Sequence, residues 1–256
     1  MTEPLLNITG LRAAYDETEI LKEIDLSITS GEIVCIVGES GSGKSTLIKA
    51  IHGMDDLTIT QGTILFDGKD ITKLSGAARR QLMGTEIGLI PQNPAASFNP
   101  IRKYSAQFRE ALAGHSMSYD EERIEMLLRK IGLKDGRMVL KKRPYELSGG
   151  MNQRIAIAAA MMFHPKLLMC DEATSALDVT TAGIVADELL KIRAEQGTSI
   201  LMVTHHLGLA RRMADRIGIM EKGRIIEFNT TEAIFESPVS ECTRRLIHDV
   251  PRLKTK

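Results

Sequence analysis

The sequence predicts an α/β protein with a mostly parallel β-sheet, a small antiparallel β subdomain and a helical insertion. Short apolar runs alternate with segments long enough for helices, as where Ile33–Val37 precedes Lys44–His52. Such alternation is typical of a doubly wound parallel sheet. Asp67-Gly68, between two apolar segments, is a hairpin signal and predicts the antiparallel element. The stretch from Phe98 to about Pro144 is polar and helix-like with no buried-strand pattern, which indicates the insertion.

The composition is that of an ordinary soluble globular protein. The chain has 256 residues, 43% of them hydrophobic, enough for one large core or a core plus a smaller subdomain. Lys+Arg and Asp+Glu both number 33, so there is no basic excess of the kind that favours nucleic acid. No apolar run reaches 18 residues and the first ten residues lack a secretory signal, so we expect neither a membrane span nor export. The three scattered cysteines indicate free thiols in a reducing, cytoplasmic compartment.

Two strands are predicted before the first helix. Leu5–Ala13 and Leu21–Thr29 carry apolar residues with a period near two, and the residues between them are turn-like. Ser30-Gly31 then turns the chain into the strand Ile33–Val37.

The best-defined motif is the glycine-rich turn Gly38-Glu-Ser-Gly-Ser-Gly-Lys-Ser-Thr46, which matches Gly-x-x-x-x-Gly-Lys-Ser/Thr at every fixed position. Glycines let backbone N–H groups curl around an anion, and the following helix adds its N-terminal dipole. The pattern assigns Lys44 to the β- and γ-phosphates and Ser45 to Mg²⁺. A flexible Gly/Ser loop is the alternative, but the flanking strand and helix favour a nucleotide phosphate site and a P-loop NTPase core. Tyr15, at the end of the first strand, either stacks on a base or simply packs.

The next segments lead to a second strand tip. A hairpin is predicted for Gly62–Ile71 and a short helix for Ser75–Met83. The apolar strand Ile87–Ile90 ends at Pro91-Gln92-Asn93-Pro94, where two prolines enforce a loop. Gln92 is therefore held at a strand end.

The insertion is followed by a second glycine-containing helix start. We expect helices at Tyr104–Ala113 and Tyr119–Ile131, and Leu147-Ser-Gly-Gly150 opens a helix that runs to Phe163. Glycines before a helix leave backbone N–H groups for an anion.

The buried-strand pattern Lys166–Met169 ends in Asp171-Glu172. Two carboxylates at a strand tip are costly to bury without a cation, so Mg²⁺ is a natural partner. The remaining predicted elements are the helix Thr180–Gln196, the strand Ser199–Val203 before Thr204-His-His206, the hairpin Arg216–Glu221 with Arg224–Phe228, and the helices Thr230–Phe235 and Glu241–Val250.

Four candidate segments each follow an apolar strand: Gly38–Thr46, Gln92, Asp171-Glu172 and His205. The carboxyl ends of parallel strands share one edge of a sheet, and ligands bind there. We therefore expect these segments to converge.

In this order, the motifs make the chain resemble the ATP-binding subunit of an ABC transporter from end to end. Leu147-Ser-Gly-Gly-Met-Asn-Gln-Arg154, placed before Met169-Cys-Asp-Glu172, is similar to the signature of that family, which a generic P-loop ATPase lacks. The resemblance implies ATP hydrolysis coupled to import across a membrane, with ATP and Mg²⁺ as cofactors. It implies that Ser175-Ala-Leu-Asp178 is the loop that crosses between two such subunits.

The resemblance also implies roles for individual residues: Tyr15 stacks on adenine, Gln92 senses Mg²⁺ and the transporter, Asp171 binds Mg²⁺, Glu172 is the general base and His205 contacts the γ-phosphate. Taken alone, His205 fits a strand-end histidine and Glu172 a solvated carboxylate, so their joint order carries the assignment. The predicted catalytic residues are Lys44, Gln92, Glu172 and His205. The predicted nucleotide-binding residues are Tyr15, Gly38, Ser40, Gly41, Gly43, Lys44, Ser45, Thr46, Ser148, Gly149 and Gly150, and the predicted Mg²⁺ ligands are Ser45, Gln92 and Asp171.

The resemblance implies one ABC ATPase domain over residues 1–256. Residues 1–92 and 166–229 form the α/β nucleotide-binding core with the β subdomain, 93–165 the helical subdomain with the signature, and 230–256 short C-terminal helices.

Finer matching points to the oligopeptide, dipeptide and nickel importers. Gln92-Asn-Pro-Ala-Ala-Ser-Phe-Asn-Pro100 resembles the extended Q-loop of that branch, and Ile234–Pro238 with Thr243–Leu246 resembles its C-terminal segment. Departures are Ala173 for the usual Pro, His206 for Asp and Cys242 for Tyr, and the lack of a longer cysteine-bearing tail leans toward a nickel-type subunit.

The partners implied are a second ABC ATPase subunit, related or identical, two transmembrane permease subunits and an extracytoplasmic solute-binding protein, with no nucleic acid. The implied location is the cytoplasmic face of the cell membrane, as a peripheral subunit. The alternative is a non-transport ABC-type ATPase in repair or translation, but the chain has no sustained heptads and only one phosphate loop. A GTPase or kinase is disfavoured because no Asn-Lys-x-Asp segment is present.

Overall fold

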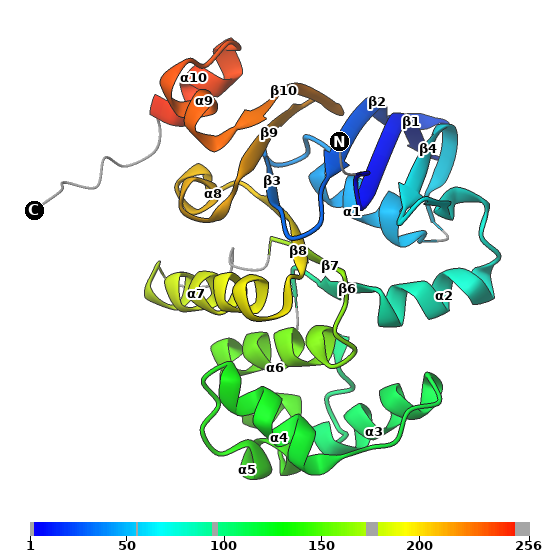
Figure 1. The fold of residues 1–256 in the computed structure, drawn as a ribbon, viewed down its shortest axis with the longest axis vertical. Coiled ribbons are helices and arrows are strands. Elements are labelled where there is room, and N and C mark those ends of the chain that lie inside the picture. Colours follow the sequence, from blue (N-terminus) through cyan, green and yellow to red (C-terminus); the bar gives the residue numbers. More distant parts are fainter. Residues whose placement is uncertain (1–2, 55, 94–96, 173–178, 249–256) are drawn as a thin grey trace, which may run out of the picture.

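A six-stranded sheet crosses the middle of the molecule in the order β10-β9-β3-β8-β7-β6 (Figure 1). The computed structural model describes residues 3–54, 56–93, 97–172 and 179–248. β3, β8, β7, β6 and β9 are parallel, and β10 pairs antiparallel with β9, so the predicted mostly parallel sheet is confirmed. The strands are β3 (Ile33–Val37), β6 (Ile87–Ile90), β7 (Leu167–Asp171), β8 (Ser199–Thr204), β9 (Arg216–Glu221) and β10 (Arg224–Thr230).

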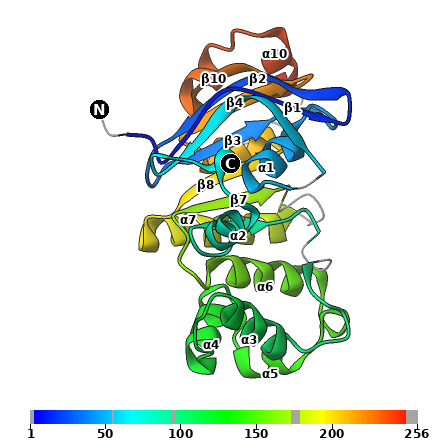
Figure 2. The ribbon, with the colours of Figure 1, turned by 90° about the vertical axis from the view of Figure 1, so that its right-hand side faces the viewer.

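A second, antiparallel sheet has the order β2-β1-β4-β5 and lies above strands β3, β8 and β7 of the central sheet in Figure 2. The predicted turn at Asp67-Gly68 joins β4 to β5. This subdomain is larger than the hairpin expected there, because β4 begins at Thr58 and pairs along most of β1 as well. The strands are β1 (Leu6–Tyr15), β2 (Thr18–Ile28), β4 (Thr58–Phe66) and β5 (Lys69–Asp70).

The helices match the predicted segments with two additions. The additions are α5 and α8, of 6 and 7 residues, which are too short to display a helical period in the sequence. The helices are α1 (Lys44–His52), α2 (Gly76–Thr85), α3 (Tyr104–Gly114), α4 (Glu121–Lys130), α5 (Gly136–Lys141), α6 (Gly149–Met161), α7 (Val179–Gln196), α8 (Leu207–Met213), α9 (Thr231–Glu236) and α10 (Glu241–His248).

Two hydrophobic clusters lie on opposite faces of the central sheet. Successive side chains of a strand point to opposite faces, so Cys35 of β3 belongs to one cluster and Val34 and Ile36 to the other. One cluster extends into α3 to α8, and the other into α1 and the antiparallel sheet. Burial on both faces explains why β3 is apolar throughout.

The helices α3 to α6 form a group below the sheet in Figure 1. The subdomain boundaries stated above stay a prediction. All three cysteines are free thiols.

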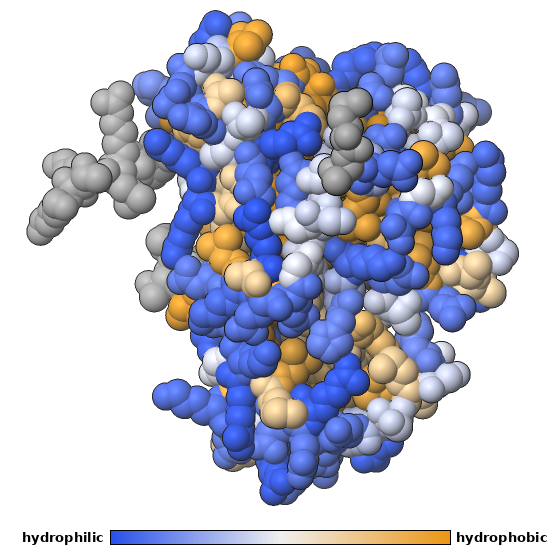
Figure 3. All heavy atoms as spheres, viewed as in Figure 1, coloured by the Kyte–Doolittle hydropathy of each residue, from blue (hydrophilic) through white to orange (hydrophobic). Residues whose placement is uncertain are grey.

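Hydrophilic side chains predominate on the face of the molecule shown in Figure 3, with hydrophobic side chains scattered among them. Within the described ranges, no helix has both the length and the apolar character needed to cross a bilayer.

Candidate functional site

The predicted strand-tip residues converge at the carboxyl edge of the central sheet. β3, β6, β7 and β8 run parallel there, so the loops that follow them meet. Ser45 Oγ, at the start of α1, donates a hydrogen bond of 2.8 Å to Asp171 Oδ1 at the end of β7. Two predicted Mg²⁺ ligands that are 126 positions apart in the chain are thereby brought together.

The phosphate loop requires its glycines. A Cβ at Gly38 would lie 2.2 Å from the carbonyl oxygen of Met220, so no larger residue fits without moving β9. Gly41 and Gly43 have φ of 80° and 108°, a region that only glycine adopts readily. Ser40 and Gly41 are exposed, while Thr46 is buried in α1.

Lys44 is buried over this loop, with 4% of its surface exposed. Its Nζ donates to the carbonyl oxygens of Gly38 and Glu39 at 2.9 and 2.8 Å, and it lies 3.9 Å from Glu172 Oε1. Burial lowers the pKa of Lys44, and the nearby carboxylates of Glu172 and Asp171 oppose that shift. The ammonium group is therefore held by carbonyl oxygens in a position where phosphate oxygens would be stronger partners.

The two carboxylates at the tip of β7 lie in a partly buried position. Burial raises the pKa of Asp171 and the charge of Glu172 adds to the increase, whereas the hydrogen bond from Ser45 opposes it. Hydroxyl and carboxylate oxygens are the ligands that Mg²⁺ prefers, and a divalent cation would offset this repulsion. The donor set of Ser45 and Asp171 fits the implied Mg²⁺.

Glu172 is the point where the other candidates meet. Gln92 Nε2 donates to Glu172 Oε2 at 3.2 Å, and His205 Nδ1 lies 3.5 Å from Glu172 Oε1. Glu172 has φ of 45°, unusual for a residue other than glycine, so its backbone conformation is strained. The ring of His206 lies 4.0 Å from that of His205, centroid to centroid.

Tyr15 lies at the end of β1 close to the helix that begins in the phosphate loop. The Nζ of Lys49, on α1, is 5.2 Å from the centroid of the Tyr15 ring. The ring thus lies beside α1, and its stacking on adenine stays a prediction.

The signature residues Ser148, Gly149 and Gly150 begin α6. Ser148 is the N-cap and its hydroxyl accepts a 3.3 Å hydrogen bond from the Met151 N–H. Ser148 and Gly149 are exposed, and between described residues no hydrogen bond or ion pair joins the signature to the phosphate loop. The predicted crossing loop Ser175–Asp178 and the departure at Ala173 lie outside the described residues.

One residue of the phosphate loop was missed in the sequence analysis. Ser42 is buried and its Oγ has no hydrogen-bond partner, while its carbonyl oxygen accepts a 2.9 Å bond from the Gly223 N–H. Position 42 is unspecified in the motif, so the pattern carried no signal for it. A buried hydroxyl that has no hydrogen-bond partner inside the loop is consistent with a site that binds the oxygens of a phosphate group.

Comparison with known proteins agrees with this geometry. Residues 21–175 match the ABC transporter family. The chain is 37% identical to the oligopeptide transport ATP-binding protein OppD of Lactococcus lactis subsp. cremoris over 251 residues, 96% of this chain and 74% of that protein. It is 36% identical to OppD of Bacillus subtilis, over 98% of this chain and 73% of that protein.

Two solved structures share the fold. One is the dimeric post-hydrolysis state of the ATP-binding cassette MJ0796 bound to ADP and Pi, with a TM-score of 0.78, 27% identity, and coverage of 88% of this chain and 98% of that one. The other is CbiO1 from Clostridium perfringens, part of the ABC transporter complex CbiONQ, with a TM-score of 0.80, 27% identity, and coverage of 98% and 97%. The predicted fold class, ATPase activity, and ATP and Mg²⁺ as cofactors are confirmed. The chain belongs to the ABC transporter family, as an ATP-binding subunit.

Proposed function

We propose that this chain hydrolyses ATP at the carboxyl edge of its central sheet to energise an importer of peptides. The observation that carries the site is the set of contacts around Glu172, which joins the tips of β3, β6, β7 and β8 through Lys44, Gln92 and His205. The relatives described above are named for oligopeptide transport, and another, from Agrobacterium fabrum, for peptidoglycan transport. None of these relatives is named for nickel, so they do not support the expectation of a nickel-type subunit.

In the proposed reaction, Glu172 accepts a proton from the water that attacks the γ-phosphorus of ATP. The bond between that phosphorus and the bridging oxygen breaks, and the oxygen leaves on ADP. Lys44 exchanges its carbonyl partners for phosphate oxygens, and the N–H groups of the phosphate loop hold the charge that develops. Mg²⁺, when bound through Ser45 and Asp171, would supply further charge neutralisation. Gln92 and His205 orient the carboxylate of Glu172 from opposite sides.

A second ATPase subunit would complete the site. The exposed start of α6 offers the Ser148 hydroxyl and the first N–H groups of a helix to an anion outside its own chain. A partner's bound ATP is the anion that this end of α6 fits, so ATP would join the two subunits.

The permease subunits would bind at a groove between the core and the helical group. This groove, of about 1090 Å³, is lined by the end of α1, by α2 and by the end of α3. Among the residues that the structure describes, its lining includes Arg79, Arg80, His52 and His115 and no carboxylate. Burial, together with Arg79, lowers the pKa of His52, so arginines supply most of the positive charge. A cytoplasmic segment of a permease with acidic residues fits this lining, and an extracytoplasmic solute-binding protein would complete the importer.

The experiment is purification of the tagged chain from detergent-solubilised membranes, followed by ATPase assays of the complex in liposomes. We expect two permeases to co-purify, and ATP turnover to rise when the solute-binding protein is added with peptides and not with nickel. Recovery with ribosomal or DNA-repair proteins instead of permeases would support the non-transport alternative.

A charge reversal tests the groove. Arg80→Glu should weaken permease co-purification and leave ATP affinity unchanged, because Arg80 is exposed and makes no contact with the phosphate loop. Lys141→Glu, at the exposed end of α5, is the matched control. Equal permease recovery with both variants would contradict docking at the groove.

A further inference from the structure

The turn between β9 and β10 packs against the outside of the phosphate loop. The Gly223 N–H donates to the carbonyl oxygen of Ser42 at 2.9 Å. Gly38 packs so close to the carbonyl oxygen of Met220, near the end of β9, that a Cβ would lie 2.2 Å from it. The loop therefore contacts this hairpin at two points. Residue 42 is an unspecified position of the phosphate-binding motif, and residue 223 lies outside the motif.

The contact at Ser42 fixes the orientation of one peptide unit. All described peptide bonds are trans, and in a trans peptide the C=O and the following N–H point in opposite directions. Because the Ser42 carbonyl points outward to Gly223, the Gly43 N–H points to the other side, into the curve of the loop. We propose that Gly223 is a positioning residue for phosphate binding, which directs the Gly43 N–H toward the nucleotide. This inference rests on the proposed function of Gly38–Thr46.

Gly223 is itself held from its other side. Its carbonyl oxygen accepts a 2.8 Å hydrogen bond from the Lys22 N–H of β2. Lys22 and Glu23 together face the single residue Arg12 of β1, which makes a β-bulge. Glu23 has φ of 59°, and its carboxylate lies 3.5 Å from Arg224. The bulge therefore turns the Lys22 N–H of the antiparallel sheet toward Gly223. The hydrogen bonds from Lys22 to Gly223 and from Gly223 to Ser42 thus link the antiparallel sheet to the hairpin of the central sheet and to the phosphate loop.

Only glycine fits at position 223. Its φ is +83°, and a Cβ there would lie 2.0 Å from the carbonyl oxygen of Ile20. The oxygen that the Cβ would meet is a backbone atom of β2, which cannot swing aside as a flexible side chain can. An added methyl group must therefore displace the turn and with it the partner of Ser42.

The test is Gly223→Ala in the full chain, with titration of ATP, GTP and inorganic tripolyphosphate. We expect the Kd values for all three to rise by the same factor, about tenfold, the loss that follows when about one hydrogen bond is no longer made. The preference for ATP over GTP should not change, because the effect lies on the phosphate side. Gly68→Ala is the matched control: Gly68 has φ of +74° in the other hairpin turn, and its Cβ would meet nothing within 4 Å. This control should lose a little thermal stability and bind all three ligands as the wild type does.

An affinity of Gly223→Ala within twofold of the Gly68→Ala value overturns the proposal. Lys44→Ala separates this failure from that of the phosphate site itself, since only failure of the site would leave Lys44→Ala with wild-type affinity. Hydrogen exchange on the wild-type chain gives a measurement that does not depend on how the variant folds. The Gly223 and Lys22 amides should exchange more slowly with tripolyphosphate present, and unchanged rates there with slowed exchange in the phosphate loop overturn the proposal.

Discussion

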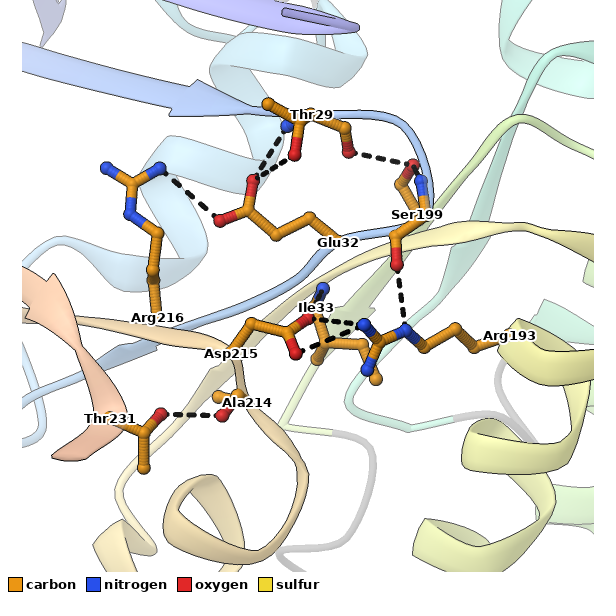
Figure 4. A network of polar contacts seen from close by, with 10 residues as sticks. Thr29, Glu32, Ile33, Arg193, Ser199, Ala214, Asp215, Arg216 and Thr231 are labelled. Atoms are coloured by element: carbon orange, nitrogen blue, oxygen red, sulfur yellow. Dashed lines mark hydrogen bonds and ion pairs between the residues drawn. The ribbon is translucent and has the colours of Figure 1, made fainter.

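The two edges of the parallel sheet carry the same kinds of charged residue in different arrangements. At the amino edge, Glu32 accepts hydrogen bonds from the Thr29 N–H and hydroxyl at 2.7 and 2.9 Å and pairs with Arg216 at 3.3 Å (Figure 4). Asp215 accepts the Ile33 N–H at 2.8 Å and pairs with Arg193 at 2.9 Å. Each of these carboxylates is surrounded by donors of its own chain at hydrogen-bonding distance.

At the carboxyl edge, the ion pairs of Glu172 are longer than those at the amino edge. Glu172 lies 3.9 Å from Lys44 and 3.5 Å from His205, and burial together with the charge of Glu172 raises the pKa of the neighbouring Asp171. The Lys44 ammonium group donates its hydrogen bonds to backbone carbonyl oxygens and not to a carboxylate. The comparison teaches that carboxylates whose hydrogen-bond partners all come from the same chain stabilise the sheet. A cluster with long ion pairs and adjacent like charges is instead suited to binding a charged ligand.

Glu172→Gln should show the largest effect. The amide keeps the shape of the side chain but cannot accept a proton, and loss of a general base costs about 10²–10⁴ in rate. Hydrolysis by the assembled complex should nearly stop while ATP affinity persists, and a closed dimer should appear with ATP in size-exclusion chromatography. Wild-type turnover by this variant would remove Glu172 as the base.

Ser148→Arg should lower turnover of the assembled complex by about 10²-fold, the scale for losing one donor to a developing anion. ATP binding to the variant chain alone should not change, because the signature does not contact its own phosphate loop. Ser148→Thr keeps a hydroxyl and is the control. Full turnover with arginine would reject the assignment across subunits.

Lys44→Ala should weaken ATP binding about 10–100-fold, since a charge-assisted contact to phosphate is worth about 1.5–3 kcal/mol. The fold should persist, because the buried ammonium group is itself costly to desolvate. Calorimetric titration and thermal melting measure both effects. Lys166→Ala, which removes a lysine paired with Asp67 and Glu86 on the surface, should leave ATP affinity intact.

Glu32→Gln probes the opposite edge. Replacing this buried acceptor by an amide should lower the free energy of unfolding by about 1–3 kcal/mol, because Arg216 and Thr29 lose a charged partner. ATP affinity and turnover should remain at wild-type values. A loss of turnover as large as that of Glu172→Gln would contradict a purely structural role for the amino edge.

The smallest effect concerns Glu227 on β10, a third carboxylate enclosed by donors. Burial alone would raise its pKa, but hydrogen bonds from the Thr243 hydroxyl and the Val239 and Ser240 N–H groups outweigh burial and lower the pKa below its usual 4.5. Because the folded pKa is the lower one, the stabilisation is present above pH 4.5 and is lost as the pH falls through the folded value. The melting temperature of the wild type should exceed that of Glu227→Gln at about pH 6 and approach it at about pH 3. A difference independent of pH would show that the charge of Glu227 is not involved.

The sequence alone determined the parts of this protein that depend on neighbours in the chain. Glycine spacing before Lys44 marked the phosphate loop, apolar runs marked β3, β6, β7 and β8, and a hairpin pattern marked β9 and β10. The rule that parallel strands end at one edge was enough to predict that Gln92, Glu172 and His205 converge. These inferences succeed because period, turn chemistry and strand direction are local properties.

Only the tertiary structure decided the contacts between distant segments. Ile33 and Asp215 are 182 positions apart, and no pattern around either one indicates the other. The same holds for Ser42 and Gly223, because a backbone hydrogen bond leaves no residue type in the sequence. α5 and α8 were missed because their 6 and 7 residues contain less than two full turns, so packing and not periodicity selects the helix. The sequence thus determined where the chemistry lies, and the fold decided what holds it in place.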